Sequence, residues 1–159
     1  MEQAIFAAGC FWGAQYYFDQ VPGVTSTIVG YTGGTTENPT YDDVITHNTG
    51  HAEAVLIEFD ADKLSYETLV RQFFRMHDPT QLNRQGPDVG DDYRSAIFYV
   101  TDDQKETAEK VKAELQSKLG TEIVTEITEA GPFYRAEEHH QKYTERTGKG
   151  MCHVEYGPV

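Results

Sequence analysis

The pattern of apolar and polar positions along the chain predicts short strands and helices that alternate. Apolar residues at alternate positions, or in short runs bounded by Gly or Pro, are typical of strands, and apolar residues three or four apart are typical of one helix face. The predicted strands cover Gln3 to Ala8, Val24 to Tyr31, Ala52 to Phe59, Ala96 to Val100 and Glu122 to Thr128. The first predicted helix begins at Cys10 or Phe11 and ends at about Gln20, and a short helical turn is predicted at Tyr41 to Asn48. A third helix is capped by Ser65 and has Leu69, Val70, Phe73 and Phe74 on one face. The last two predicted helices cover Thr101 to Gly120 and Glu137 to Tyr143. This alternation predicts one compact α/β or α+β domain over residues 1–159, with a mixed sheet and helices on its faces.

The composition excludes several classes of protein. Hydrophobic residues make up 38% and aromatic residues 12% of the 159 residues, more than an intrinsically disordered chain contains. The formal net charge of −13 repels nucleic-acid phosphates and anionic membrane surfaces, so we expect neither as a partner. No apolar run approaches the ~20 residues that a membrane-spanning helix needs, and the start of the chain lacks the basic region of a signal peptide. We therefore expect a cytoplasmic protein.

Residues 78–95 form a polar stretch rich in Asp, Gly, Pro, Asn and Gln. A connection of this length without regular structure is uncommon in a compact domain unless it serves a function. This stretch is therefore a candidate for one wall of a functional site.

The chain has two cysteines, Cys10 and Cys152, which lie near its opposite ends. A pair so few in number and so far apart is not the disulfide framework of a small secreted domain. In a reducing cytoplasm, a bond between them would be transient and catalytic rather than structural.

Cys10 stands where the first predicted strand turns into the first predicted helix, between Gly9 and Gly13. The unpaired N–H groups and the positive dipole end at a helix N-terminus favour the thiolate, which is the reactive form of cysteine. The glycines let a ligand approach the backbone closely, and Phe11 and Trp12 can form the walls of an apolar pocket. Position alone leaves two interpretations open, a nucleophile in a pocket and an inert cysteine in the core.

Four blocks of sequence, taken in order, make the first interpretation stronger. They are Gly9-Cys10-Phe11-Trp12-Gly13; Thr49 to Val55; the stretch with His77 to Gln81, Asn83 to Gly86, Asp88 to Gly90 and Tyr93 to Ile97; and the stretch with Phe133-Tyr134, Ala136 to Glu138 and His140-Gln141. Together they resemble the peptide methionine sulfoxide reductase A family, over about Ala4 to Tyr143. The resemblance implies an α+β fold, a two-layer sandwich with a ferredoxin-like core, long loops and an irregular C-terminal tail.

The resemblance also implies a reaction that removes oxygen from a methionine sulfoxide, and residues for each task. Cys10 is the nucleophile that attacks the sulfur, and Glu53 is the acid that protonates the leaving oxygen. A carboxyl group in an apolar pocket has a raised pKa, which suits it to this role near neutral pH. The other implied site residues are Tyr41 and Tyr93, which hydrogen-bond the sulfoxide oxygen, Asp88, which orders the polar network, and Phe11 and Trp12, which receive the substrate methyl group. His51 is a further candidate for substrate binding, and we expect no metal and no cofactor.

The first step would leave a sulfenic acid on Cys10, which condenses with a second thiol to form a disulfide. Cys152 is the only other cysteine, and it lies in a tail over about residues 144–159 that we expect to be mobile. A bystander role for Cys152 stays open. The resemblance implies that thioredoxin or a similar dithiol protein reduces this disulfide, and that the S epimer of the sulfoxide, protein-bound or free, is the substrate. Nothing in the sequence requires more than a monomer.

Three other functions are compatible with parts of the sequence. A cysteine hydrolase would use Cys10 as nucleophile, His51 as base and Glu53 as orienting group, although it would have no use for a second cysteine. A zinc site would draw on His139, His140, Cys152 and His153, but adjacent histidines point to different helix faces, so we expect these to be solvated or capping residues. A pure binding module would not need the complete set of candidate catalytic residues.

The sequence departs from the family pattern at a few positions. Thr46-His47-Asn48 stands where relatives more often carry small residues or a Cys, and the other departures are Pro87, Arg135 and His139. None of them removes a catalytic candidate, so we expect them to affect the shape of the pocket rim.

Overall fold

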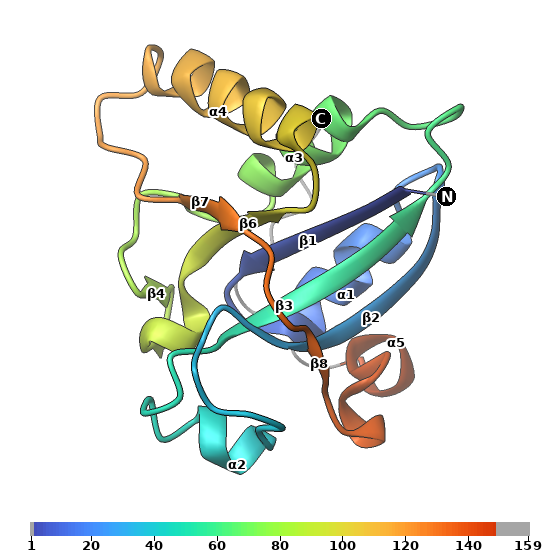
Figure 1. The fold of residues 1–159 in the computed structure, drawn as a ribbon, viewed down its shortest axis with the longest axis vertical. Helices are drawn as coiled ribbons and strands as arrows, with labels where there is room; N and C mark the ends of the chain where they lie inside the picture. The colour runs from blue at the N-terminus through green and yellow to red at the C-terminus, as the bar shows by residue number, and fades with distance from the viewer. Residues whose placement is uncertain (1, 149–159) are drawn as a thin grey trace.

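The computed structural model describes residues 2–148, and its frame is a six-stranded sheet (Figure 1). The strands lie in the order β7-β6-β1-β3-β2-β8, and neighbouring strands are antiparallel except for the parallel pair β6 and β7. Their bounds are Glu2–Ala8 for β1, Val24–Thr32 for β2, Ala52–Phe59 for β3, Ser95–Tyr99 for β6, Glu126–Glu129 for β7 and Tyr134–Arg135 for β8. The predicted mixed sheet is confirmed, and the first four predicted strands match within one residue at each end.

Helices cover one face of this sheet. Their bounds are Phe11–Asp19 for α1, Tyr41–Val44 for α2, Tyr66–Arg75 for α3, Asp102–Gln116 for α4 and Tyr143–Thr147 for α5. Phe6 of β1 packs against Phe18 of α1 and Phe73 of α3, with ring centroids 5.6 and 5.0 Å apart, so these two helices share a face with the main core. A smaller cluster that includes Ala54 and Phe98 is buried on the other face. The two-layer α+β arrangement is therefore confirmed.

Hydroxyl side chains begin the two longest helices, as the sequence predicts. The Ser65 hydroxyl accepts a hydrogen bond from the Thr68 amide, and the Thr101 hydroxyl accepts one from the Gln104 amide at 3.1 Å. The sequence Thr101 to Gln104 fits a capping box, but the box is incomplete, because the Gln104 side chain accepts from the Val100 amide and donates to the Gln3 carbonyl instead. This side chain thus ties α4 to the start of β1.

The polar stretch at 78–95 is folded rather than structureless. It contains a two-stranded ribbon of β4 (Arg84–Gln85) and β5 (Asp88–Val89), followed by a 3-10 turn, η1 (Asp91–Tyr93). The Gln85 side chain accepts from the Asp78 amide and also hydrogen-bonds its carbonyl, which fastens the ribbon to the end of α3. The stretch therefore presents Asp88 and Tyr93 on a fixed frame.

Two of the predicted elements differ from the structure. The predicted strand at Glu122 to Thr128 begins only at Glu126, because the amides of Ile123 and Val124 donate to the Gln116 side chain and the Pro79 carbonyl rather than to β6. The predicted helix at Glu137 to Tyr143 is a 3-10 turn, η2 (Glu138–His140), separated from α5 by Lys142 in the left-handed region (φ 56). Helix α5 occupies Tyr143–Thr147, the start of the expected tail, while Cys152 lies outside the described residues.

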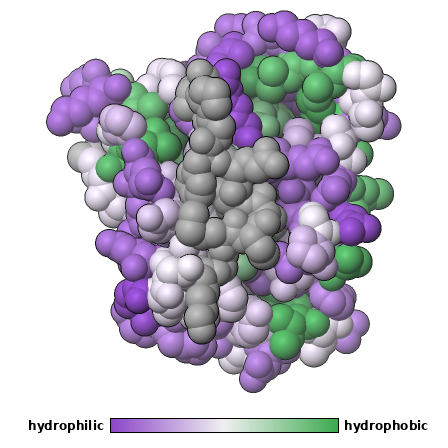
Figure 2. All heavy atoms as spheres, turned by 180° about the vertical axis from the view of Figure 1, so that it is seen from behind, coloured by the Kyte–Doolittle hydropathy of each residue, from purple (hydrophilic) through white to green (hydrophobic). Residues whose placement is uncertain are grey.

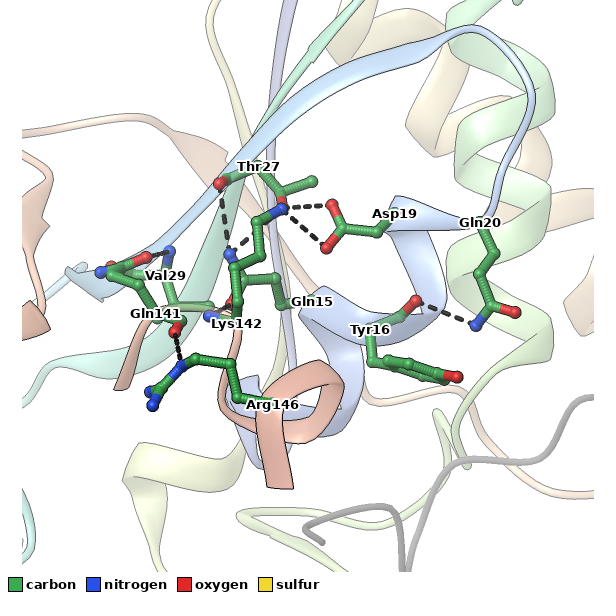
Figure 3. Close-up of polar contacts among 9 residues, drawn as sticks. All are labelled: Gln15, Tyr16, Asp19, Gln20, Thr27, Val29, Gln141, Lys142 and Arg146. Atoms are coloured by element: carbon green, nitrogen blue, oxygen red, sulfur yellow. Dashed lines mark hydrogen bonds and ion pairs between the residues drawn. The ribbon is translucent and has the colours of Figure 1, made fainter. Parts of the chain in front are cut away.

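A set of polar contacts fastens this C-terminal segment to α1 and β2 (Figure 3). The Gln141 side chain pairs with both backbone groups of Val29, at 3.0 and 2.9 Å. The Lys142 amide donates to Gln15 at 2.7 Å, and its ammonium donates to Asp19 at 2.7 Å. These contacts hold η2 and α5 beside the beginning of α1, where Cys10 lies.

The surface is mainly polar. Figure 2 shows hydrophilic residues over much of the rear face, with hydrophobic groups in separate patches. Among the described residues, the large apolar side chains that are exposed come from separate parts of the chain: Ile45, Leu82, Val89, Val100 and Leu119. None of the helices in the described part of the chain has the length and apolar character needed to cross a membrane.

Candidate active site

Cys10 lies at the junction between β1 and α1, as predicted. It is the N-cap residue of α1, it is partly exposed, and Gly9 before it adopts a φ of 91° that favours glycine. Burial of the thiol and the neighbouring Glu53 carboxyl raise the pKa of Cys10, and the Trp12 and Gly13 amides lower it by less. The amides at the helix start favour the thiolate, as expected, but burial and Glu53 outweigh them, so the net shift of the Cys10 pKa is upward and favours the thiol.

Glu53 is the buried acid of the site. It lies on β3 beside Tyr31 of β2, on the sheet face that α1 covers, and it is 1% exposed. Its Oε1 atom accepts a hydrogen bond from the Phe11 amide at 3.2 Å, while Oε2 has no hydrogen-bond partner among the described residues. Burial, with smaller effects from Asp92 and Asp88, raises the pKa of Glu53 well above its ordinary value. The raised pKa expected from the sequence is therefore found, and Glu53 holds a proton that it can give away.

Two phenols share the site with these groups. Tyr41 is the first residue of α2 and Tyr93 is the last residue of η1, and both are half-buried. Burial, followed by the Glu53 charge, raises the pKa of Tyr41 to about 12, and the same two causes raise the pKa of Tyr93. Cys10 influences both phenols as well, so the fold brings all four groups within electrostatic range of one another. Both phenols remain protonated donors.

Two aspartates border this cluster. Asp88 of β5 is half-buried, and its charge contributes to the raised pKa values of Cys10 and Glu53. Asp92 was not among the residues that the sequence analysis selected, yet it is fully buried and influences Glu53 more than Asp88 does. Two adjacent acidic residues, Asp91 and Asp92, precede Tyr93 in the sequence, but nothing in the sequence indicates which of the two is the more buried.

Aromatic rings form the wall next to Cys10. Phe11 is buried, and Trp12 stacks on Tyr143 with ring centroids 4.1 Å apart. The Trp12 indole N–H donates to Nδ1 of His140 at 3.0 Å, and the His140 ring lies 4.5 Å from that of Tyr41. Phe11 and Trp12 thus lie next to Cys10 in the chain, and the rings of His140 and Tyr143, from the far end of the chain, pack against them.

Comparison with known proteins assigns this arrangement to a family. The family model described as peptide methionine sulfoxide reductase matches residues 2–159. This chain belongs to the peptide methionine sulfoxide reductase family. It is 51% identical over 155 residues to peptide methionine sulfoxide reductase MsrA of Methanothermobacter thermautotrophicus, covering 96% of this chain and 92% of that protein.

Solved structures agree with this assignment. Mxr1 from Saccharomyces cerevisiae in reduced form matches with a TM-score of 0.89 and 33% identity, covering 94% of this chain and 87% of that one. Mxr1 in complex with Trx2 matches with a TM-score of 0.64 and 26% identity, covering 89% of this chain and 84% of that one. The fold and the family expected from the sequence are both confirmed.

His51 has a different place in this family member from the one that we expected. It is buried, its Nδ1 atom accepts from the Gly34 amide at 3.0 Å, and its Nε2 atom lies 2.6 Å from the Thr36 carbonyl. Both ring nitrogens are thus engaged by backbone groups, so neither can bind substrate or take a proton from Cys10. His51 organises the 34–36 turn, and the hydrolase interpretation loses its base.

The described histidines also argue against the zinc interpretation. His140 is 3% exposed and uses Nδ1 to accept from Trp12, so the solvated or capping role that we expected for it is wrong. Burial lowers the pKa of His140, which keeps the ring neutral and able to accept. Cys152 and His153 lie outside the described residues.

Within residues 2–148, one group of three potential metal ligands lies close together: His47, Asp91 and Asp92. The His47 Nδ1 atom is 2.6 Å from Asp92 and 4.0 Å from Asp91. The shorter distance is that of a charge-assisted hydrogen bond, so this group is a hydrogen-bonded pair, His47 and Asp92, with the half-buried Asp91 as an acidic neighbour.

Glu137 joins the C-terminal segment to β2 and α2, the elements that carry Tyr31 and Tyr41. Its carboxylate accepts from the Tyr31 hydroxyl at 3.0 Å and from the Tyr41 amide at 3.1 Å. Burial raises the pKa of Glu137, but the hydrogen bonds from the Tyr41 amide and its own amide outweigh that effect, and the net shift is downward. The ionised Glu137 therefore fixes the start of α2, and with it the position of Tyr41.

Proposed function

We propose that this protein reduces methionine sulfoxide to methionine with the thiol of Cys10, and that Glu53 supplies the proton. The observation that supports this most strongly is the buried Glu53 carboxyl, held by the Phe11 amide through one oxygen and unpartnered among the described residues at the other. A neutral acid with a free oxygen beside the only described cysteine is suited to protonate a sulfoxide oxygen during nucleophilic attack.

The first step combines two proton movements with one attack. Glu53 gives its proton to the sulfoxide oxygen, and the carboxylate that remains takes the proton of the Cys10 thiol, because burial raises the pKa of Glu53 and so makes its carboxylate a stronger base. The Cys10 sulfur attacks the sulfoxide sulfur, and the oxygen passes to Cys10 as a sulfenic acid. The methionine sulfur is reduced by two electrons and the Cys10 sulfur is oxidised by two, so the step needs no other reactant.

The surrounding residues orient the substrate. The Tyr41 and Tyr93 phenols, which keep their protons, donate hydrogen bonds to the sulfoxide oxygen, and the aromatic wall of Phe11 and Trp12 receives the methyl group. Asp88 orders the polar side of the pocket. We assign the S epimer of the sulfoxide, protein-bound or free, as the substrate.

The second step returns Cys10 to its thiol. Cys152 attacks the sulfenic acid, water leaves, and a Cys10–Cys152 disulfide forms. A dithiol protein of the thioredoxin type then reduces this disulfide by thiol exchange; the yeast relative Mxr1 has been solved in complex with Trx2. We propose that the protein acts as a monomer in the cytoplasm, where such reductants keep thiols reduced.

Incubation with methyl p-tolyl sulfoxide, without reductant, followed by mass spectrometry of the protein, tests both steps. The expected result is one equivalent of sulfide and a peptide pair linked through Cys10 and Cys152. Each enantiomer is assayed separately, and reduction of the R enantiomer alone contradicts the assignment. Absence of sulfide from both enantiomers overturns the proposed function.

A further inference from the structure

His47 makes a close contact behind the site that the proposed reaction does not use. Its backbone lies in the left-handed region, with φ at 64°, a conformation that Asn, Asp and His adopt more often than other L residues do. Its Nδ1 atom lies 2.6 Å from Oδ1 of Asp92. A Cβ on Gly90 would come within 2.4 Å of the His47 ring and 2.6 Å of Asp92, so only glycine lets this ring reach the carboxylate. The left-handed turn at His47 and the close approach at Gly90 thus bring the ring to this hydrogen bond.

Asp92 connects this contact to the acid of the site, because η1, which carries Asp92, packs against β3, which carries Glu53. Its side chain is 1% exposed, against 46% for His47, and its Oδ2 atom has no hydrogen-bond partner among the described residues. A negative charge on Asp92 raises the pKa of Glu53, and it does the same for Tyr41 and Tyr93. The carboxylate therefore acts on Glu53 and on both phenols without donating a proton itself.

His47 opposes the burial of that charge. Burial raises the pKa of Asp92, while its own backbone amide and then the His47 hydrogen bond and charge lower it. Asp91 raises it again by a smaller amount. Without His47, Oδ1 of the buried Asp92 carboxyl has no side-chain partner, and the protonated form of Asp92 becomes more favourable relative to the ionised form.

We propose that His47 is a positioning residue for the reductase step: its imidazole holds the Asp92 carboxylate ionised and in place behind Glu53, so that Glu53 keeps its proton into more alkaline solution. The proposal rests on the proposed function. Other charged and titratable groups surround the His47–Asp92 pair. Asp91 lies next to His47, and Asp92 is within electrostatic range of Glu53, Tyr41 and Tyr93. Asp88 also acts on Glu53.

Two substitutions of His47 separate the hydrogen bond from the backbone. His47→Gly removes the ring and suits a φ of 64°, so this variant is expected to fold at least as well as the wild type. His47→Asn also tolerates this conformation, and its side-chain amide nitrogen stands the same number of bonds from Cα as Nδ1 of histidine. It therefore keeps a donor to Asp92. Asn38→Gly, at another left-handed position (φ 47), is the control for backbone relief.

The measurement is the single-turnover rate of methyl p-tolyl sulfoxide reduction from pH 6 to 9, with EDTA in every buffer. In His47→Gly, the alkaline limb of the pH–rate profile is expected to move to a pH about one unit lower. The rate on the alkaline side of the limb should then be about tenfold lower than that of the wild type, and the rate at pH 6 should change little. His47→Asn and Asn38→Gly are expected to keep the wild-type limb. Asp92→Asn is expected to reproduce the displacement of His47→Gly, with no further displacement in the double variant.

An alkaline limb that stays in place or moves to higher pH in His47→Gly overturns the proposal. So does a His47→Asn profile displaced as far as that of His47→Gly, since a donor at the same position would then have no effect. Failure of the proposed function looks different, because the wild-type protein would release no sulfide at any pH.

Discussion

Replacement of Glu53 by glutamine tests the centre of the proposed chemistry, because the site accommodates the amide with little change of shape. The side-chain oxygen of the introduced glutamine can keep the hydrogen bond from the Phe11 amide, which Glu53 accepts at 3.2 Å. The side-chain nitrogen then occupies the position of Oε2, which has no partner among the described residues. The substitution thus removes the transferable proton and leaves the packing of a residue that is 1% exposed.

The expected effect on the rate follows from the loss of a positioned acid. General acid catalysis typically contributes about 10²–10⁴-fold, so single-turnover reduction of methyl p-tolyl sulfoxide by Glu53→Gln should be slower by a factor in that range. The alkaline limb of the pH profile should disappear, because no acid remains to be titrated. A variant within tenfold of the wild type, or one that keeps the alkaline limb, would refute the role of Glu53 as acid.

The same substitution, which slows the reaction, is expected to increase the stability of the fold. Because burial raises the pKa of Glu53, the folded state holds this proton more tightly than the unfolded state does. Stability is therefore greatest below the ordinary pKa of 4.5 and falls as pH rises toward the folded-state pKa. Glu53→Gln has no carboxyl group to ionise and so does not lose stability in this way. It should therefore melt at a higher temperature than the wild type at pH 7.5, and the difference in melting temperature should be smaller near pH 5. A lower melting temperature at pH 7.5 would mean that Glu53 is ionised and paired in the fold.

Three other variants test separate parts of the proposal. Cys10→Ser should form no sulfide in a single turnover, since the hydroxyl is a far weaker nucleophile than the thiol, and a rate near that of the wild type would remove Cys10 from the mechanism. Cys152→Ser should release about one equivalent of sulfide but lose turnover with thioredoxin as the reductant; full thioredoxin-driven turnover would exclude Cys152 as the resolving residue. His51→Ala should be destabilised in urea by about 1–3 kcal/mol for each backbone group that it leaves unpaired, at Gly34 and Thr36. Unchanged stability with a large loss of rate would instead return His51 to the chemistry.

Local pattern was sufficient wherever neighbours along the chain decide the structure. The apolar run before Gly9 and the change of period after it predict the strand and the helix that meet at Cys10, and the structure has both. The pattern failed where distant partners intervene. Ile123 and Val124 suit a strand by composition, but their amides bond to Gln116 and Pro79, so β7 begins later.

The sequence by itself determined the order of the first three strands of the main sheet and the helices between them, the position of Cys10 at a helix start, and the family, because motifs and periodicity are local properties. Only the tertiary structure decided the electrostatics of the site. Whether Cys10 carries a proton, and whether Asp92 or Asp91 faces Glu53, depends on burial and on charges from other elements. The contact of Trp12 with His140, 128 positions apart, is of the same kind. The physical reason is that the free energy of a charge depends on all that surrounds it in space, and the chain order does not contain those distances.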